Sequence, residues 1–288
     1  MESDIEVAAI VTNPDRPAGR GMKLKPSPVK EAAQTAGLDV IQVAKARDPE
    51  LHERLVALAP DVAVVVAYGS ILPARLLEVP HKGFVNLHFS LLPLYRGAAP
   101  VQRSIMNGDD TTGVSVMVLT EGMDEGPVIV RREEPIASDD TSATVGSRLA
   151  VKGAEVLVAA LDGYLDGSLV PQPQDDAAAT YAPKITTEDA RIDWSADATS
   201  IRDLVRALDP HPGAWTTLDG QRLKVLQVHE ADGPVLAPGE IATSDDLVVG
   251  TGSGPLALDR IQPATKRAMS GADFVRGARP AANARMGS

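Results

Sequence analysis

Apolar and polar positions follow a repeating order through the first part of the chain. Short apolar runs rich in β-branched residues alternate with segments whose apolar positions lie three or four residues apart, which indicates strands followed by helices. The run at 62–67 is apolar throughout, which is typical of a parallel strand covered on both faces. This alternation predicts an α/β fold with a mostly parallel sheet. The predicted strands are 5–11, 39–42, 62–67, 83–89, 113–119 and 128–134, and the predicted helices are 29–36, 49–58, 98–107 and 144–161.

The pattern changes after Pro171. A polar segment rich in Pro and Ala is followed by one predicted helix at 198–207 and then by short apolar runs separated by glycine-containing turns. Regularly spaced short strands of this kind predict a small β-barrel. We therefore expect a first domain over 1–170, a linker over 171–184 and a barrel domain over 185–288. The predicted barrel strands are 214–218, 223–229, 239–242, 247–250 and 255–262.

The amino-acid composition excludes several classes of protein function. The chain has 288 residues, no cysteine and a formal net charge of −11. Disulfides and thiolate chemistry are excluded, and the chain shows neither a signal-peptide pattern nor a membrane-spanning apolar stretch, so we expect a cytoplasmic protein. The acidic total disfavours general nucleic-acid binding, but charge acts locally. Residues 13–30 contain five basic residues and one acid, and the segment 16–28 predicts a mobile basic loop.

One predicted strand carries two polar side chains. Asn86 and His88 are two positions apart within 83–89, so both project from the same face, while the apolar residues between and beside them face the other way. An amide beside an imidazole can hold a carbonyl oxygen as it becomes an oxyanion. A hydrogen-bonded polar pair at a strand end is the other interpretation. The strand leads into a Ser-Leu-Leu-Pro turn, and open α/β sheets bind ligands beyond the carboxyl ends of their strands, which favours a functional site.

A third candidate is Asp124, in a glycine-rich turn after the predicted strand 113–119. Turn aspartates are common, so this residue alone indicates little. If its strand neighbours that of Asn86 and His88, the three side chains could bind an oxyanion and move protons. The loop 67–73 is either a plain connection or one wall of the same pocket. No histidine or carboxylate spacing predicts a metal site, and no phosphate-binding glycine motif is present.

Longer motifs point to a family. The run from Asn86 through Pro93, followed by Arg96-Gly97-Ala98-Ala99-Pro100, resembles the folate-dependent formyltransferases. The segments 12–21, 181–185 and 206–214 are similar to the branch of that family that acts on methionyl-tRNA. The likeness runs from about Val7 to about Arg279. It implies a Rossmann-like catalytic domain followed by an OB-type barrel.

The resemblance also implies an activity. The formyl group of 10-formyltetrahydrofolate, the donor co-substrate, would pass to the α-amine of methionyl initiator tRNA, with no metal and with the protein acting as a monomer. Asn86 and His88 would stabilise the oxyanion, and Asp124 would keep His88 charged and relay protons. The folate pocket would be formed by Tyr68, Gly69, Ile71, Ser90, Leu91, Leu92 and Pro93. The tRNA would contact Arg16, Arg20, Lys23 and Lys25 in the basic loop and Arg202, Arg206 and Lys224 in the barrel domain, although residues 185–288 have a net charge of 11 − 14 = −3.

The sequence departs from the family pattern at two places. The family begins with a strand–turn–helix that contains a Phe-Ala-Gly-Thr-Pro-like turn, whereas this chain begins where the second strand is expected. Because the first strand is central in that fold, we expect a gap beside 62–67 and a poorly stable or inactive protein. His211 replaces a residue that is often aromatic in the family.

Two other functions remain open. The chain could formylate a small amine, such as an amino sugar or glycinamide ribotide, but a small substrate would need neither the basic loop nor the barrel. It could instead be an inactive RNA-binding remnant.

Overall fold

The protein was analysed as a computed structural model, which describes all residues except 1–4, 19–20, 234, 244–245, 282–283 and 288. The chain divides into two compact units. Both are discontinuous because strands β8 (Thr111–Val118) and β9 (Val128–Pro135) and helix α5 (Ser142–Asp166) contribute to each. The first unit comprises Met1–Arg96, Val114–Arg132 and Lys152–Ala179, and the second comprises Gly97–Gly113, Glu133–Val151 and Thr180–Ser288.

The described part of the first unit contains two sheets besides a short basic hairpin, and it confirms the α/β class. Strand β1 pairs in parallel with β4 as a separate two-stranded sheet, and the other sheet has the order β5-β6-β8-β9. Strands β5 and β6 run parallel, while β6 and β8 run antiparallel, so this sheet is mixed. The strands are β1 (Ile10–Thr12), β4 (Val40–Gln42), β5 (Ala63–Val65), β6 (Phe84–His88), β8 (Thr111–Val118) and β9 (Val128–Pro135).

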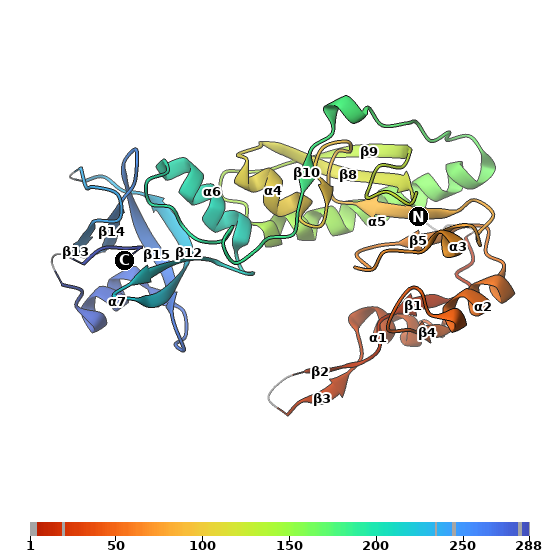
Figure 1. Ribbon diagram of the computed structural model, residues 1–288, viewed down its shortest axis with the longest axis horizontal. Helices are drawn as coiled ribbons and strands as arrows, with labels where there is room; N and C mark the ends of the chain where they lie inside the picture. The colour runs from red at the N-terminus through yellow and green to blue at the C-terminus, as the bar shows by residue number, and fades with distance from the viewer. Residues whose placement is uncertain (1–4, 19–20, 234, 244–245, 282–283, 288) are drawn as a thin grey trace. The chain divides into compact units, whose positions relative to one another are not determined.

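Capping residues define where the predicted helices of this unit begin. Ser27 and Asp48 each accept a hydrogen bond from a backbone N–H of the first turn, and each is followed by a proline at a position where no donor is needed. Figure 1 shows helices α1 and α2 beside β1 and β4. The helices are α1 (Pro28–Thr35), α2 (Pro49–Leu58) and α3 (Ala74–Leu77), with a 3₁₀ turn at Asp176–Ala178.

Strand β5 differs from its prediction. It is only three residues long, and Val64 and Val66 are 42% and 46% exposed, so it is not covered on both faces as the apolar run indicated. The cause is the pairing: β5 lies at one end of its sheet, and among the described strands only β6 pairs with it. Among the described strands, β5 is therefore an edge strand of its sheet.

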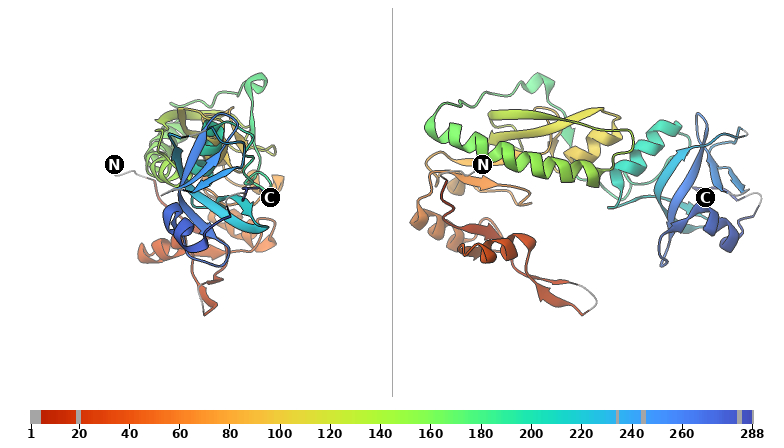
Figure 2. Two further views of the ribbon diagram at one scale, coloured as in Figure 1. Left: turned by 90° about the vertical axis from the view of Figure 1, so that its left-hand side faces the viewer. Right: turned by 180° about the vertical axis from the view of Figure 1, so that it is seen from behind.

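The basic segment forms a hairpin rather than an irregular loop. Strands β2 (Arg16–Ala18) and β3 (Lys23–Lys25) pair antiparallel, with Arg16 opposite Lys25. The hairpin projects away from α1 and β1 (Figure 2). Arg20 was predicted to contact tRNA and lies outside the described residues.

Helix α5 (Ser142–Asp166) extends beyond its prediction at both ends. From Lys152 onward it belongs to the first unit. A Cβ atom on Gly153 would lie 2.8 Å from a methyl carbon of Leu87, so the glycine allows the helix to approach β6 closely. This contact holds the strand that carries Asn86 and His88.

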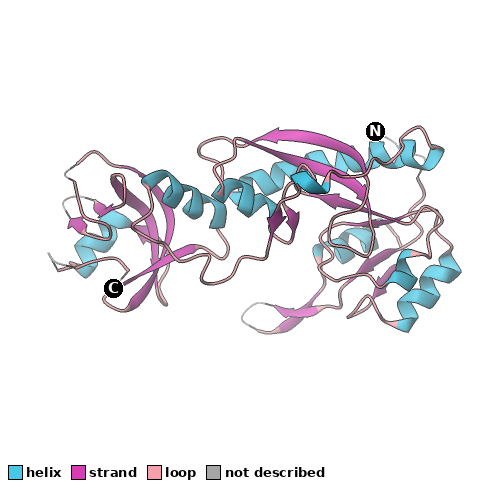
Figure 3. Ribbon diagram, turned by 45° about the horizontal axis from the view of Figure 1, so that its top comes forward, coloured by secondary structure: helices cyan, strands magenta, loops and turns pink. Residues whose placement is uncertain are grey.

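The second unit is built on an antiparallel sheet that curves as a half-barrel (Figure 3), which confirms an OB-like domain. Its order is β11-β12-β15-β14-β13, and β16 pairs with β15. The buried residues Ala214, Val225 and Ile261 are paired across three strands and line its interior. Its elements are β11 (Ala214–Leu218), β12 (Gln221–Glu230), β13 (Ile241–Thr243), β14 (Leu247–Gly250), β15 (Pro255–Pro263), β16 (Met269–Ser270), α4 (Pro100–Met106), α6 (Ala198–Leu208) and α7 (Gly271–Ala278); β7 (Arg96–Gly97) and β10 (Tyr181–Ala182) are two-residue strands.

Candidate active site

The candidate site begins at the carboxyl end of β6. Asn86 and His88 share one face of the strand, opposite Met117 and Ser115 of β8. His88 is only 5% exposed, whereas Asn86 is half-buried. The side-chain amide of Asn86 forms no hydrogen bond with any residue that the structure describes. Its donor is therefore available to a bound carbonyl oxygen.

Both ring nitrogens of His88 face a defined oxygen. Nε2 lies 2.9 Å from the carbonyl oxygen of Tyr95, which can only accept, so we assign the hydrogen to Nε2. Nδ1 faces Oδ2 of Asp124 at 3.7 Å, which is too long for a direct hydrogen bond. The neutral ring therefore has its lone pair on Nδ1, and when that atom is protonated the adjacent carboxylate stabilises the resulting charge.

Ser115 holds the loop that follows β6. Its hydroxyl donates to the Ser90 carbonyl (2.7 Å) and accepts from the Leu92 N–H (3.0 Å). The Ser90 hydroxyl in turn donates to the Leu94 carbonyl at 2.5 Å, next to Tyr95, which has a left-handed φ of +59°. These contacts fix the carbonyl group that orients His88. Sequence reasoning missed Ser115, because a serine within an apolar strand carries no local signal of such a role.

Residues outside the turn that carries Asp124 hold this turn in place. A Cβ atom on Gly126 would lie 1.9 Å from the Val118 carbonyl oxygen, so this position requires glycine. The side-chain amide of Gln174 donates to the carbonyls of Asp124 (2.8 Å) and Gly126 (2.7 Å). Gln174 therefore positions the carboxylate of Asp124 opposite His88.

A buried arginine completes this support. Nε of Arg96 donates to Oε1 of Gln174 at 3.0 Å, and its guanidinium pairs with Asp176 at 2.7 Å. Arg96 is 3% exposed, so its orientation is well fixed. Arg96 and Gln174 are supporting residues that sequence reasoning missed, because they meet only through contacts between segments far apart in the chain.

We expect Gln174→Ala to lower kcat for formyl transfer about tenfold, because the Asp124 turn loses two hydrogen bonds and the carboxylate shifts from His88. The KM for the formyl donor should change little. Gln172→Ala is the matched control, because that side-chain amide donates to Val170 rather than to the Asp124 turn. Steady-state kinetics and thermal unfolding of both variants test this; equal kcat values would show that Gln174 does not position the site.

The structure distinguishes among the residues predicted to bind folate. The side chains of Ser90 and Leu92 are buried, so their predicted part in the folate pocket is to contribute backbone atoms or to hold the loop. Leu91 and Pro93 are half-buried and Ile71 is exposed, so these three remain predicted contacts. Gly69 has a left-handed φ of +74° in the loop after β5.

Tyr68 precedes that glycine and packs against the core cluster that contains Phe84. Its hydroxyl is buried and has no hydrogen-bond partner among the described residues. Burial raises the pKa of the Tyr68 phenol, so the group stays protonated and can donate a hydrogen bond to a polar atom of a bound ligand.

Two of the three cations predicted to contact tRNA in the barrel domain have partners within the protein, and their tRNA role stays a prediction. The Arg206 side chain is 12% exposed, and its guanidinium donates to Asp203 and to the carbonyls of Ala137 and Asp140. Arg202 lies near Asp203 (3.5 Å) and Glu230 (3.6 Å), which offset its charge.

Lys224 was the third of these cations. Its ammonium donates to the Pro212 carbonyl at 2.7 Å, but no carboxylate pairs with it among the described residues, so it retains an uncompensated charge.

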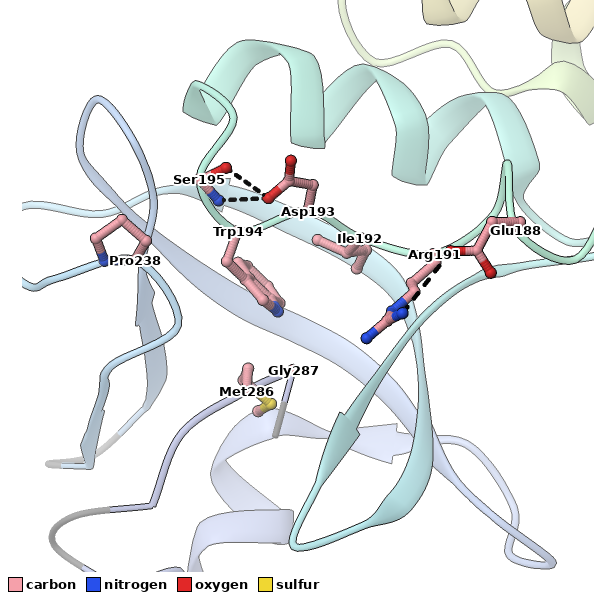
Figure 4. A pocket seen from close by; sticks show the side chains of 9 residues that line it. All are labelled: Glu188, Arg191, Ile192, Asp193, Trp194, Ser195, Pro238, Met286 and Gly287. Atoms are coloured by element: carbon pink, nitrogen blue, oxygen red, sulfur yellow. Dashed lines mark hydrogen bonds and ion pairs between the residues drawn. The ribbon is translucent and has the colours of Figure 1, made fainter.

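A separate cleft of about 610 Å³ lies in the second unit (Figure 4). None of the predicted site residues lines it. Its lining residues are Glu188, Arg191, Ile192, Asp193, Trp194, Ser195, Pro238, Met286 and Gly287. Among the described residues, no group of three or more histidine or acidic side chains is placed to hold a metal ion. No helix in the described ranges is both long enough and apolar enough to cross a membrane.

Known proteins share this sequence and fold. The family model for formyl transferases matches residues 1–161, and that for the formyl transferase C-terminal domain matches residues 184–279. The methionyl-tRNA formyltransferase of Streptomyces coelicolor is 50% identical over 284 residues, which cover 98% of this chain and 92% of that protein. The methionyl-tRNA formyltransferase of Thermobifida fusca is 48% identical over 281 residues, covering 97% and 91%.

Two solved structures share the fold at low identity. An N-formyltransferase from Helicobacter canadensis, in complex with folinic acid and dTDP-3-aminofucose, has a TM-score of 0.65 and 14% identity, covering 90% of this chain and 100% of that one. HypX from Aquifex aeolicus, in complex with tetrahydrofolic acid, has a TM-score of 0.63 and 20% identity, covering 85% and 43%. The two family matches together span most of the sequence, and the chain therefore belongs to the formyl transferase family of transferases.

Proposed function

We propose that this enzyme transfers the formyl group of 10-formyltetrahydrofolate to the α-amine of methionyl initiator tRNA, for translation initiation. The observation that carries the proposal is the free amide of Asn86 beside a buried imidazole whose Nδ1 faces a carboxylate. The names of the relatives support the acceptor. The folate compounds in the two similar structures support the donor.

Asn86 and His88 stabilise the developing charge. When the amine attacks the formyl carbon, a C–N bond forms and the carbonyl electron pair moves onto oxygen. The Asn86 amide donates to that oxygen, and the protonated His88 ring adds positive charge. The ring keeps its orientation through Nε2–H and the Tyr95 carbonyl. Because the Asn86 amide and the His88 ring hold these positions before the reaction, little reorganisation is needed during it.

Asp124 and His88 move the proton. The attacking amine must lose a proton, and the folate nitrogen must gain one when its bond to the formyl carbon breaks. The Asp124 carboxylate accepts the first proton, directly or through one water, and returns it to the leaving nitrogen. The 3.7 Å separation between Asp124 Oδ2 and His88 Nδ1 leaves the carboxylate without a direct hydrogen bond to that ring.

The folate-binding role is proposed for the two loops beside this trio. The loop after β5 contributes Tyr68, Gly69 and Ile71, and the loop after β6 contributes its backbone together with Leu91 and Pro93. The buried hydroxyl of Tyr68 is a donor without an acceptor among the described residues, which suits a polar heterocycle. The proposed domains remain 1–170 and 185–288, joined by 171–184.

The β2–β3 hairpin is the proposed tRNA contact of the first unit. Arg16, Lys23 and Lys25 have no ion-pair partner among the described residues. Asp15, the one acid nearby, is held by Lys30 at 2.9 Å, and this hydrogen bond lowers the pKa of the Asp15 carboxyl. The opposite charges of Asp15 and Lys30 offset each other, so the hairpin keeps a net positive charge that can attract phosphates.

Neutralising the basic residues of the hairpin should weaken tRNA binding without changing the rate of formyl transfer. For Arg16→Gln/Lys23→Gln/Lys25→Gln we expect the slope of log KM for tRNA against log salt to fall by about 0.7–0.9 for each phosphate that the hairpin no longer neutralises. The kcat at saturating tRNA should be unchanged. Arg47→Gln/Lys45→Gln, outside the hairpin, is the control. An unchanged salt slope would place the tRNA elsewhere.

The function itself is tested by acceptor specificity. Labelled formyl transfer from 10-formyltetrahydrofolate should be measured with methionyl initiator tRNA, an amino sugar nucleotide and glycinamide ribotide under one set of conditions. We expect transfer only to the tRNA. Preferential transfer to a small amine would favour the alternative activity.

A further inference from the structure

A tryptophan and two arginines form a cluster on the outer face of the half-barrel. Trp215 alternates with the buried Ala214 and Thr216 along β11, so its ring lies on the face away from the core. The guanidinium carbon of Arg222 lies 4.3 Å from the ring centroid, and that of Arg191 lies 5.8 Å from it. We call Trp215, Arg191 and Arg222 the Trp215 cluster.

The ring of the Trp215 cluster is fixed in place. Its Nε1–H donates to the Thr187 carbonyl at 2.8 Å, and its backbone bonds to the segment that carries Arg191, through Ala190 and Ile192. A ring held at its edge and along its backbone is a rigid base for flexible arginine side chains. Cation–π contact holds each guanidinium near the ring and reduces the entropy it loses when it binds a ligand.

The charges of the cluster are not compensated internally. Arg222 is exposed and has no carboxylate partner among the described residues. The ion pair that Arg191 forms among the described residues is with Glu188 at 3.7 Å, and both side chains are largely exposed, so this pair is weak. Three other acids lie nearby in sequence: Asp189 is bonded by Arg103, Asp193 is bonded by Ser195, and Asp219 lies in the turn between β11 and β12. Lys224 lies directly opposite Trp215 and adds a third cation on the same face.

This chemistry suits a phosphate backbone. Guanidinium groups bind phosphate oxygens with two parallel N–H donors, and a guanidinium stacked on an aromatic ring keeps those edge donors free. An acidic protein partner would also be attracted, but the second unit's overall negative charge disfavours extended contact with an acidic surface, whereas a polyphosphate chain can follow a narrow basic strip. The observations therefore favour RNA.

We propose that the Trp215 cluster is a phosphate-binding site for the tRNA acceptor, in which Arg222 and Arg191 contact the backbone and Trp215 is the positioning residue. The inference rests on the proposed function, because it takes methionyl-tRNA as the acceptor. It differs from the contacts predicted at Arg202 and Arg206, whose guanidinium groups have partners within the protein.

Three variants test the site. Arg222→Gln should raise the KM for tRNA about tenfold, as expected when a charged hydrogen bond is removed, and should reduce the salt slope by about 0.7–0.9. Arg222→Lys keeps the charge but loses the planar fork, so its salt slope should stay near the wild-type value while its KM rises. Trp215→Leu should also raise the KM for tRNA. Combining Trp215→Leu with Arg222→Gln should increase that KM little further, because both changes remove the same site.

Arg276→Gln is the matched control, because that arginine is also exposed in the same unit but lies on α7 and pairs with Asp273. The kcat and the KM for the formyl donor should stay at wild-type values in every variant, and thermal unfolding checks that each one folds. If the wild type does not formylate methionyl-tRNA, the proposed function fails. If it does, and Arg222→Gln has the wild-type KM and salt slope, this inference alone is overturned.

Discussion

Replacing His88 by alanine is expected to reduce kcat for formyl transfer by about 10²–10⁴-fold, the range for loss of an oxyanion-stabilising or acid–base group. Asn86→Ala and Asp124→Ala should fall in the same range. The affinity for the formyl donor should change much less, because these groups act mainly on the charge that develops in the transition state. Single-turnover rates and donor titrations separate the two effects.

The chain offers a close control for this experiment. His229 also has Nδ1 beside a carboxylate, that of Asp259 at 2.7 Å, but it is exposed on the barrel domain. His229→Ala should keep wild-type kcat. A His88→Ala variant with near-wild-type turnover would show that the β6 imidazole is not part of the chemistry.

Replacing Arg148 by methionine is expected to destabilise the second unit by about 2–3 kcal/mol. Arg148 donates to Glu134 at 2.8 Å and to both carboxylate oxygens of Asp140 at 2.7 Å, and both acids are buried. Removing the guanidinium leaves two buried carboxylates with less compensation, a change that costs about 3–5 kcal/mol when the pair is fully buried. The expected loss in the free energy of unfolding is smaller here because the Arg148 side chain is 40% exposed.

The same contact makes stability depend on pH. The hydrogen bond from Arg148 holds the pKa of the Asp140 carboxyl far below its usual range. A carboxyl whose pKa is lower in the folded state contributes stability above its unfolded pKa of about 3.9, and this contribution is lost as pH falls toward the folded value. Stability should therefore fall below about pH 4 in the wild type, and less steeply in Arg148→Met.

Urea unfolding of both proteins at several pH values between about 2 and 7 measures this difference. Arg132→Met is the control, because Arg132 is exposed and its guanidinium reaches, among the described residues, a backbone carbonyl alone. Parallel pH profiles for wild type and Arg148→Met would contradict a stabilising role for the Arg148–Asp140 pair.

Local sequence patterns were enough to predict part of this molecule. The two-residue period of 83–89 placed Asn86 and His88 on one face, because alternation in a strand is a local property. The helix over 49–58 was predicted at its observed bounds, and Pro60 marks its end. The pairing of β6 with β8, which is antiparallel, was not predictable, because register depends on contacts between strands.

Local sequence patterns also could not predict the residues that hold the site in place. Gln174 reaches the Asp124 turn across 50 positions, and Arg96 reaches Gln174 across 78. A single glutamine or arginine in a polar segment has no periodicity that would mark such a contact. Arg206 shows another limit of local patterns: its charge predicted a surface contact, whereas its hydrogen bonds to Asp203 and to the Asp140 carbonyl depend on the tertiary structure.

The most direct test of the central claim is the rate at which the protein forms formylmethionyl-tRNA from 10-formyltetrahydrofolate, compared between wild type, Asp124→Asn and Asp124→Ala. Asparagine keeps the shape of the carboxylate but can neither accept the proton nor stabilise the charged His88 ring. We expect ready formation by the wild type and a reduction of about 10²-fold or more in both variants, each of which should unfold like the wild type. Wild-type rates in Asp124→Asn would contradict it.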